Sequence, residues 1–298
     1  YVEKENDEKK EKEMIRQRLG KDLLFFDGGM GTLLQEKGLA PGELPETWNL
    51  THSEEIYKIH RQYIEAGSDI ILTNTFGANA LKFHDDSCSL EEIIKAAVSH
   101  VKKAEREALL QTGDERKIYT ALDVGPTGKL LKPMGDLEFE TAYEAFKEVV
   151  ILGEQAGADL IHIETMSDTY ELKAAVLAAK ENTSLPVFAT VIFDERKKLL
   201  TGADVSSVVA LLEGLGVDAL GINCAMGPKE MLPVLEELIK YSSVPIIVKP
   251  NAGLPKQRDG KTYYDVTEDE FAAYMEQIVR MGACVIGGCC GTTPEHIR

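Results

Sequence analysis

The sequence predicts a (β/α)8 barrel, and three features of the chain lead to this fold class. Eight short apolar runs, rich in Val, Ile and Leu, alternate with longer stretches of helical periodicity. The runs show little alternation between apolar and polar residues, as expected of parallel strands buried on both faces. A polar residue stands at or just after the end of each run, and in a barrel those ends meet at one mouth. A doubly wound open sheet is the alternative arrangement of the same elements.

The eight expected strands follow one another at intervals typical of β–α units. Helical patterns lie between them, for example at residues 53–67, 138–157 and 269–282. Several helical patterns end in a glycine just before the next strand, which is a common helix C-terminal signal. These glycines are Gly67, Gly157, Gly216 and Gly282. The strands are residues 23–29, 69–76, 117–126, 160–165, 186–194, 219–225, 245–253 and 283–291.

The first 20 residues differ from the rest of the chain. Residues 1–20 alternate charges and then become mildly amphipathic at Met14, Ile15 and Leu19. This pattern predicts a solvated leading helix. We therefore assign residues 1–20 to an N-terminal extension and residues 21–298 to the barrel.

The last residues, TTPEHIR, have the signals of a helix start. Thr292 or Thr293 can serve as the N-cap, and Pro294 suits the first turn. A (β/α)8 barrel needs an eighth helix to cover its first and last strands. We therefore expect the eighth helix of this chain to be truncated.

Composition narrows the class of function. The 298 residues carry a formal net charge of −17, which argues against nucleic acid and against an anionic membrane surface as partners. No apolar run approaches the roughly 20 residues that cross a bilayer. The charged N-terminus has no apolar core of a secretory signal. We expect a cytoplasmic protein.

Cysteine usage indicates metal binding. The five cysteines are an odd count and include an adjacent pair, which makes a poor disulfide framework. In a reducing compartment such a cluster more often binds metal or takes part in chemistry. We interpret Cys88 and Cys284 as small buried hydrophobes. Cys224, Cys289 and Cys290 remain as the candidate site.

These three cysteines can meet at the barrel mouth. Cys224 ends the sixth expected strand, and Cys289 and Cys290 end the eighth, on either side of the seventh. Adjacent residues of a strand point to opposite faces, so both sulfurs reach one metal only if the chain turns there. The neighbouring glycines permit such a turn. Three protein ligands with one open position are typical of catalytic zinc. A vicinal disulfide and a phosphate-binding Gly-Gly loop are the alternatives.

Three thiolates suit one kind of zinc chemistry. A zinc held by histidines keeps net positive charge and acidifies water for hydrolysis. Three thiolates overcompensate the metal charge, so a fourth, incoming thiol would lose its proton and still remain nucleophilic. This favours transfer of a group to sulfur over activation of water.

Acidic residues and glycines near the mouth suggest recognition of an amino acid. Asp27 and Glu164 are placed to bind an ammonium group. Backbone N–H groups at Gly28, Gly29 and Gly31 are suited to a carboxylate. General acid–base catalysis and simple helix capping are the alternatives for the two acids.

At this point several motifs resemble the homocysteine S-methyltransferase family. The resemblance runs from about residue 21 to residue 298, and the segments at 45–56 and 202–207 are most similar to the homocysteine-binding module of cobalamin-dependent methionine synthase. The combination of GINC with GGCCGTTPEHI is the most specific part. The segments that carry the resemblance are DGGMGT (27–32), TNTF (73–76), DVGPTG (123–128), ET (164–165), GINCAMGP (221–228), PNAG (250–253) and GGCCGTTPEHI (287–297).

The resemblance implies a zinc ion held by Cys224, Cys289 and Cys290, with homocysteine sulfur as the fourth ligand. It implies Asn251 as a candidate for the open zinc position when substrate is absent.

The resemblance also implies the groups that hold the rest of homocysteine. Asp27 and Glu164 would bind the amino group, and backbone near Gly28, Gly29 and Thr165 would hold the carboxylate.

The expected reaction is direct displacement of a methyl group onto the homocysteine thiolate, giving methionine. The resemblance implies methyl-cobalamin as donor, carried by another module or a partner protein, because the D-x-H-x-x-G pattern of cobalamin modules is absent from this chain. A stand-alone enzyme that uses S-methylmethionine or another sulfonium or betaine donor is the first alternative. A Schiff-base aldolase with Lys249 as nucleophile is the second. A structural zinc barrel closed by Cys284 or His296 is the third.

Overall fold

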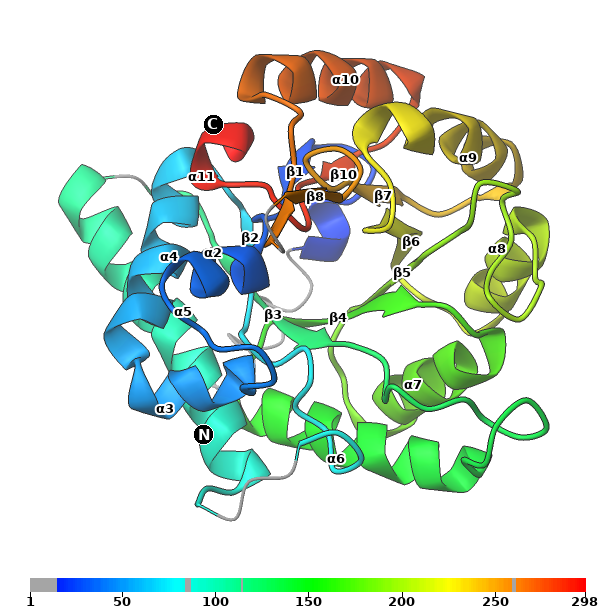
Figure 1. The fold of residues 1–298 in the computed structure, drawn as a ribbon, viewed down its shortest axis with the longest axis horizontal. Coiled ribbons are helices and arrows are strands. Elements are labelled where there is room, and N and C mark those ends of the chain that lie inside the picture. The colour runs from blue at the N-terminus through cyan, green and yellow to red at the C-terminus, as the bar shows by residue number, and fades with distance from the viewer. Residues whose placement is uncertain (1–14, 84–86, 114, 259–260) are drawn as a thin grey trace.

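The computed structural model describes residues 15–83, 87–113, 115–258 and 261–298 of the chain (Figure 1). Most of the predicted N-terminal extension, including Met14, lies outside these residues. The eight expected strands all form, and they make one parallel sheet in the order β1-β10-β7-β6-β5-β4-β3-β2. They are β1 (Leu24–Phe25), β2 (Ile70–Leu72), β3 (Tyr119–Val124), β4 (Leu160–Met166), β5 (Val187–Val191), β6 (Ala219–Asn223), β7 (Ile246–Lys249) and β10 (Val285–Ile286).

The sheet closes on itself. Phe26, directly after β1, forms a parallel bridge with Ile70 of β2, and the N–H of Asp27 donates to the Ile70 carbonyl over 3.1 Å. This closure confirms the predicted (β/α)8 barrel and excludes the open doubly wound sheet.

Helices surround the barrel on its outside (Figure 1). Where glycines were expected to stop helices, Gly67 and Gly157 adopt left-handed conformations as C-caps. The helices are α2 (Met30–Glu36), the 3-10 turn η1 (Pro45–Thr47), α3 (Trp48–Thr51), α4 (Ser53–Ala66), α5 (Leu90–Thr112), α6 (Phe139–Ala156), α7 (Thr169–Asn182), α8 (Val205–Gly214), α9 (Pro228–Tyr241), α10 (Glu268–Met281) and α11 (Pro294–Ile297).

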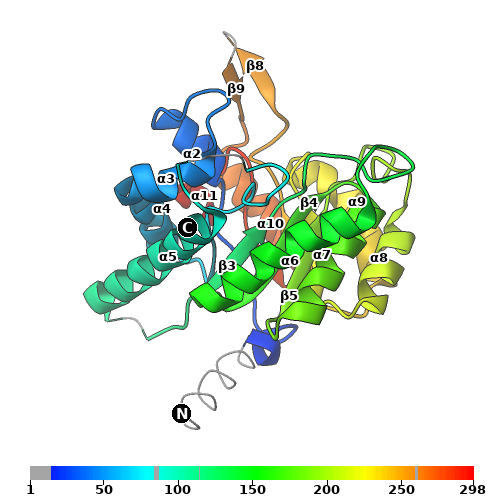
Figure 2. The ribbon, with the colours of Figure 1, turned by 90° about the horizontal axis from the view of Figure 1, so that it is seen from below.

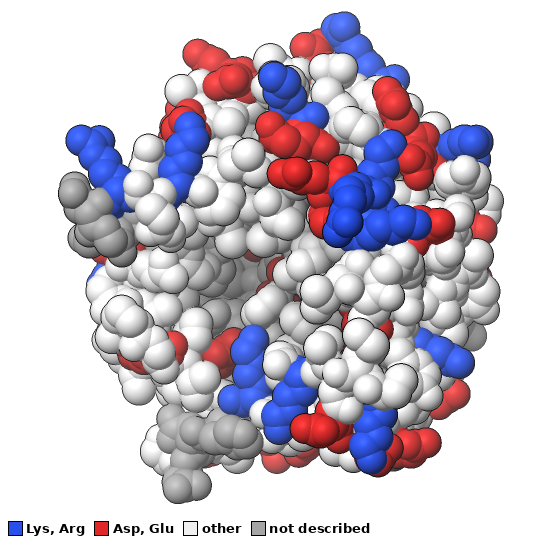
Figure 3. Space-filling model, turned by 45° about the vertical axis from the view of Figure 1, so that its right-hand side comes forward, with Lys and Arg blue, Asp and Glu red and all other residues white. Residues whose placement is uncertain are grey.

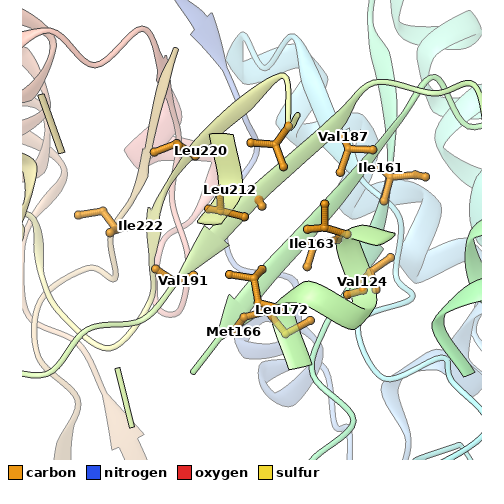
Figure 4. Packing of buried hydrophobic residues seen from close by; sticks show 14 of the residues in the cluster. Val124, Ile161, Ile163, Met166, Leu172, Val187, Val191, Leu212, Leu220 and Ile222 are labelled. Atoms are coloured by element: carbon orange, nitrogen blue, oxygen red, sulfur yellow. The ribbon is translucent and has the colours of Figure 1, made fainter. Parts of the chain in front are cut away.

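Successive strand residues serve two different cores. One set packs outward against the helices, and Figure 4 shows this layer around Ile161, Ile163 and Leu220 with Leu172 of α7 and Leu212 of α8. The other set fills the barrel interior, as Leu24, Ile70, Tyr119, Leu160 and Ile247 do. Because both faces are apolar, the strands show no polar–apolar alternation in sequence.

The bottom of the barrel is covered by the start of the described chain (Figure 2). Residues 15–18 are helical, and Ile15 is fully buried in the interior cluster. Arg16 pairs with Asp218 over 2.6 Å. The end of the predicted extension is therefore packed onto the barrel rather than solvated.

At the other end, the mouth carries a feature that sequence patterns did not predict. The short strands β8 (Lys256–Arg258) and β9 (Lys261–Tyr263) form an antiparallel hairpin that rises beside the mouth (Figure 2).

Thr293 caps α11 and Pro294 stands in its first turn, as expected. Among the described helices, none is both long and apolar enough to cross a membrane.

Candidate metal centre and substrate pocket

Three cysteine sulfurs meet at the mouth of the barrel. Cys224 follows β6, and Cys289 and Cys290 follow β10. Their sulfur atoms all lie within 4.8 Å of one another, and the Sγ atoms of Cys224 and Cys290 are 3.9 Å apart. Within the described ranges, this is the one group of three or more Cys, His, Asp or Glu side chains with metal-binding geometry. The tertiary fold thus unites the cysteines that sequence spacing selected.

The backbone bends sharply to bring the sulfurs together. Cys224 and Ala225 both adopt left-handed conformations, at φ of 55° and 59°, which cost energy for residues with a Cβ. After β10 the chain turns through Gly291, at φ of 77°. A Cβ at Gly288 would overlap the side chain of Thr292. The turn that two adjacent metal-facing cysteines require is therefore present and depends on glycine.

Without a cation, the clustered thiols favour their protonated forms. The pKa of Cys224 is raised to about 12: a hydrogen bond with Cys289 lowers it, but contact with Cys290 and burial outweigh that effect. The pKa of Cys290 is also raised to about 12. Its hydrogen bond with Cys224 lowers the pKa, but its hydrogen bond with Cys289 and its burial raise the pKa by more. A bound divalent cation would reverse this balance by stabilising thiolates.

The residues proposed to close the site are engaged elsewhere. Cys284 packs against the interior cluster that contains Ile15. His296 uses Nδ1 for Thr293 and Nε2 for the carbonyl of Val266. Neither belongs to the cysteine cluster, so the closed structural site gains no support from either residue.

Asn251 stands beside the cluster with its side chain already bonded. It is buried, and its Oδ1 accepts the N–H of Cys290 over 3.1 Å. This bond uses one of the two lone pairs of Oδ1 and leaves the other for a ligand. The role of Asn251 as fourth metal ligand remains a prediction.

A cavity of about 230 Å³ opens above the cysteines. Figure 3 shows a hollow with acidic atoms inside it and a largely uncharged rim. The residues predicted from sequence to bind substrate all line it. The polar and glycine part of the lining consists of the three cysteines and Asp27, Gly28, Gly29, Gly31, Thr32, Glu46, Thr73, Asn74, Asp123, Glu164, Thr165, Lys249 and Gly288.

Two of the predicted carboxylate-binding N–H groups are occupied by the protein. The N–H of Gly29 donates to the Oγ1 of Thr292 over 3.0 Å, and the N–H of Thr165 donates to the Oδ1 of Asn223 over 2.9 Å. The Thr165 hydroxyl accepts from Asn223, which leaves its own proton for a ligand. Backbone near Gly28 and the hydroxyl of Thr165 are therefore better placed to hold a carboxylate than the N–H of Thr165.

Asn223 is a site residue that sequence patterns missed. It is fully buried, takes hydrogen bonds from Thr165 and Thr190, and its Nδ2 lies 3.9 Å from the Sγ of Cys289. It thus links Thr165, which has a left-handed conformation at φ of 62°, to the sulfur of Cys289. Its place directly before Cys224 in the GINC segment is the one signal that could have drawn attention to it.

Lys249 is paired with an acid. Its Nζ donates to the Oε2 of Glu164 over 2.6 Å, and both side chains are buried. Burial alone would lower the lysine pKa, but the charge of Glu164 outweighs it and raises the pKa. A Schiff-base lysine needs a neutral amine, so this geometry favours the ion pair over the aldolase.

The pKa values of the two acids predicted to bind the ammonium group are shifted in opposite directions. Burial raises the pKa of Asp27 to about 7, against the opposing charge of Lys249. Burial also disfavours the charged form of Glu164, but the Lys249 charge and a hydrogen bond from His162 lower its pKa to about 2. Burial and Lys249 lower the pKa of His162 to about 4, so His162 is a neutral donor at pH 7.

The sequence and fold match known methyltransferases. A sequence model of the homocysteine S-methyltransferase family matches residues 24–298. The methionine synthases of Mycobacterium leprae and Mycobacterium tuberculosis are each 35% identical to the chain, over 296 and 292 residues. These matches cover 95% and 94% of the chain but 24% of either relative, so the chain spans about a quarter of their length.

Solved structures of a homocysteine methyltransferase have a similar fold. The homocysteine methyltransferase MmuM from Escherichia coli, in metallated form, superimposes with a TM-score of 0.79 at 25% identity, covering 93% of this chain and 94% of MmuM. Its apo form superimposes with a TM-score of 0.75 at 26% identity.

Proposed function

Because this chain belongs to the homocysteine S-methyltransferase family and is a methyltransferase, we propose that it activates homocysteine on a zinc ion and transfers a methyl group to its sulfur. The product would be methionine. The observation that carries the proposal is the cluster of Cys224, Cys289 and Cys290 at the floor of a pocket with acidic walls.

The donor set suits zinc. Zinc–sulfur bonds of about 2.3 Å in a tetrahedron place two sulfurs about 3.8 Å apart. The Sγ atoms of Cys224 and Cys290 are 3.9 Å apart. When bound, zinc would supply Lewis acidity that lowers the pKa of a fourth, incoming thiol. Asn251 remains the candidate for the fourth position in the absence of substrate.

The chain's own residues would hold the amino acid. The acidic wall that contains Asp27 and Glu164 suits the ammonium group. Backbone near Gly28, with the hydroxyl of Thr165, suits the carboxylate. The N–H of Gly29 would have to leave the Oγ1 of Thr292 to take part. These contacts would hold the homocysteine sulfur at the cysteine cluster, with the sulfur accessible from the barrel mouth. A methyl donor that enters through the mouth would then lie close to the sulfur, and this proximity would accelerate the transfer.

The transfer itself would be one displacement. The thiolate forms the new sulfur–carbon bond while the bond between the methyl carbon and the donor breaks, and its electron pair leaves with the donor. No protein base at carbon is needed, because no proton leaves the methyl group.

For the donor we propose methyl-cobalamin, carried by another module or a partner protein. The similarity to methionine synthases of which this chain spans about a quarter supports this choice. The alternative is a stand-alone enzyme with S-methylmethionine or another sulfonium or betaine donor, and the resemblance to MmuM along nearly its whole length speaks for it. We propose a cytoplasmic location, where the thiols would stay reduced.

Zinc K-edge absorption of the purified, reduced chain, with and without homocysteine, tests the proposal. We expect three sulfurs and one light atom to become four sulfurs when homocysteine is added. Cys224→Ser should bind less than stoichiometric zinc and serves as the control. A site whose ligands do not change with homocysteine, or a chain that takes up no zinc, would contradict the proposed function.

A further inference from the structure

The proposed metal centre carries an excess of negative charge. A zinc ion brings two positive charges, whereas Cys224, Cys289 and Cys290 bring three negative charges once they are thiolates. A fourth thiolate, which the proposed function requires, would leave a net charge of about −2 on the centre. The three cysteine side chains are partly buried, so water compensates only part of this charge.

The charged side chains of the pocket do not offset this excess. Lys249 is the one Lys or Arg in the lining that the structure describes, and its ammonium already donates to Glu164 over 2.6 Å. The lining also holds several buried acids, which are Asp27, Glu46, Asp123 and Glu164. Uncharged hydrogen-bond donors to the sulfur atoms are therefore the remaining way to stabilise the thiolates within the protein.

Asn223 faces the cysteine cluster from the barrel interior. It follows Ala219 at an even spacing along β6, and Ala219 belongs to the interior cluster. Asn223 is fully buried, and its Nδ2 lies 3.9 Å from the Sγ of Cys289. A hydrogen bond shortens and strengthens when its acceptor is ionised. We therefore expect this contact to tighten when Cys289 becomes a thiolate.

The orientation of the Asn223 amide is fixed by its other partners. Its Oδ1 accepts the N–H of Thr165 over 2.9 Å and the hydroxyl of Thr190 over 2.8 Å. A backbone N–H can only donate, so the atom that faces Thr165 must be the oxygen, and the nitrogen must face the sulfur. Its Nδ2 also donates to the Thr165 hydroxyl over 2.8 Å. Both ends of the amide are thus engaged, and a flip would break these bonds.

Thr190 supports this amide from the neighbouring strand. It lies on β5, is fully buried, and pairs with Gly221 in the β5–β6 register. Because the Oδ1 of Asn223 can only accept, the Thr190 hydroxyl must donate its proton in their bond. Removing that hydroxyl would leave the amide less firmly oriented, while a valine in its place would keep the shape of the side chain.

We propose that Asn223 is a positioning residue of the metal centre: its side-chain N–H donates a hydrogen bond to the metal-bound thiolate of Cys289, and Thr190 holds the amide in the orientation that this bond requires. The proposal rests on the proposed function and deepens it. A hydrogen bond draws electron density from the Cys289 sulfur, which weakens its donation to the metal. An incoming thiol is then held and deprotonated more readily at the open position.

Cobalt(II) in place of zinc provides the measurement, because its sulfur-to-metal charge-transfer band reports the electron density on the sulfurs. The variant Asn223→Leu fills the space of the amide with no donor. Its band should lie at lower energy than that of the wild-type chain, because a sulfur that has lost a hydrogen bond gives up its electron more easily. Its affinity for cobalt(II), measured by competition with a chelator, should fall by at least about tenfold.

Two variants of Thr190 test the orientation of the amide without removing it. Thr190→Val should shift the band in the same direction as Asn223→Leu, by a smaller amount. Thr190→Ser keeps the hydroxyl and should restore the wild-type band. Asn79→Leu is the matched control, because Asn79 is also a buried asparagine, its Oδ1 accepts the N–H of Leu81 over 3.1 Å, and it does not line the pocket. This control should leave the band unchanged.

Urea denaturation of the metal-free chains shows which variants fold, and the Thr190 pair decides the question if Asn223→Leu does not. The proposal is wrong if the folded variants bind cobalt(II) less tightly with an unchanged band, which is the result of a purely structural role. It is also wrong if Asn79→Leu shifts the band equally, or if Thr190→Val and Thr190→Ser behave alike. A wild-type chain that binds no cobalt(II) would instead contradict the proposed function, and this is seen before any variant is compared.

Discussion

Asp27 shows how burial changes the chemistry of a single residue. The side chain is 2% exposed, and burial raises its pKa from 3.8 to about 7. In the folded chain the carboxyl group keeps a proton that the unfolded chain has already lost. Stability therefore falls as the pH rises from about 4 to about 7. A ligand ammonium would compensate the charge that this residue carries above pH 7.

Replacing Asp27 by Asn should remove this pH dependence. Each unit of pKa shift corresponds to about 1.4 kcal/mol. The free energy of unfolding of Asp27→Asn, relative to wild type, should therefore rise by at most about 3 kcal/mol between pH 5 and pH 8. Urea denaturation of the reduced, metal-free proteins at several pH values measures it. Parallel pH profiles for the two proteins would show that Asp27 titrates normally.

Among the elements, β6 carries the tightest constraint next to the site. It presents Asn223 and then Cys224, and its Gly221 lies directly against the backbone of β7. A Cβ at Gly221 would overlap the carbonyl group of Ile247, which is held in the sheet and cannot move aside. The spacing between β6, which leads to Cys224, and β7, which contains Lys249, thus depends on one glycine.

We expect Gly221→Ala to lower the free energy of unfolding by about 3 kcal/mol or more, because a methyl group is forced into filled space. Gly214→Ala is the control: Gly214 ends α8, and nothing lies within 4 Å of an added Cβ there. That variant should be neutral or stabilised by up to about 1 kcal/mol. Chemical denaturation measures both variants. Equal stabilities would mean that the sheet adjusts to the methyl group.

At the level of the whole molecule, closure of the barrel links the metal site to stability. Cys224 and the Cys289–Cys290 pair are more than 60 residues apart and converge only when β6, β7 and β10 lie side by side. The unfolded chain has no such site. Under the proposed function, zinc would therefore bind the folded chain in preference to the unfolded chain.

Zinc should raise the thermal midpoint of the reduced chain. At free zinc about 100 times the dissociation constant, linkage adds about 2.7 kcal/mol, which corresponds to an upward shift of roughly 4–5 °C for a domain of this size. Calorimetry in zinc buffers measures the shift. Cys224→Ser should show little of it. A wild-type midpoint that does not respond to zinc would argue against a zinc site of useful affinity.

Several features of this protein could be predicted from the chain alone. Strand and helix positions, the helix-ending Gly67 and Gly157, and the helix start at Thr293 all depend on a few neighbouring residues. The eight repeats then indicate the barrel, which the structure confirms. The spacing of the cysteines on the sixth and eighth strands sufficed to select the candidate metal centre, because barrel topology places those strand ends at one mouth.

The tertiary structure alone decided which of these side chains are paired. Glu164 and Lys249 are 85 residues apart, and their ion pair depends on the register of four strands. The same holds for the bonds of Asn223 and for the unpartnered oxygen of Asp123. The β8–β9 hairpin escaped prediction because β8 is a short, polar and exposed strand without an apolar face to bury. Local propensities act within a few residues, whereas partnership and burial are set by chain segments that meet only in the closed barrel.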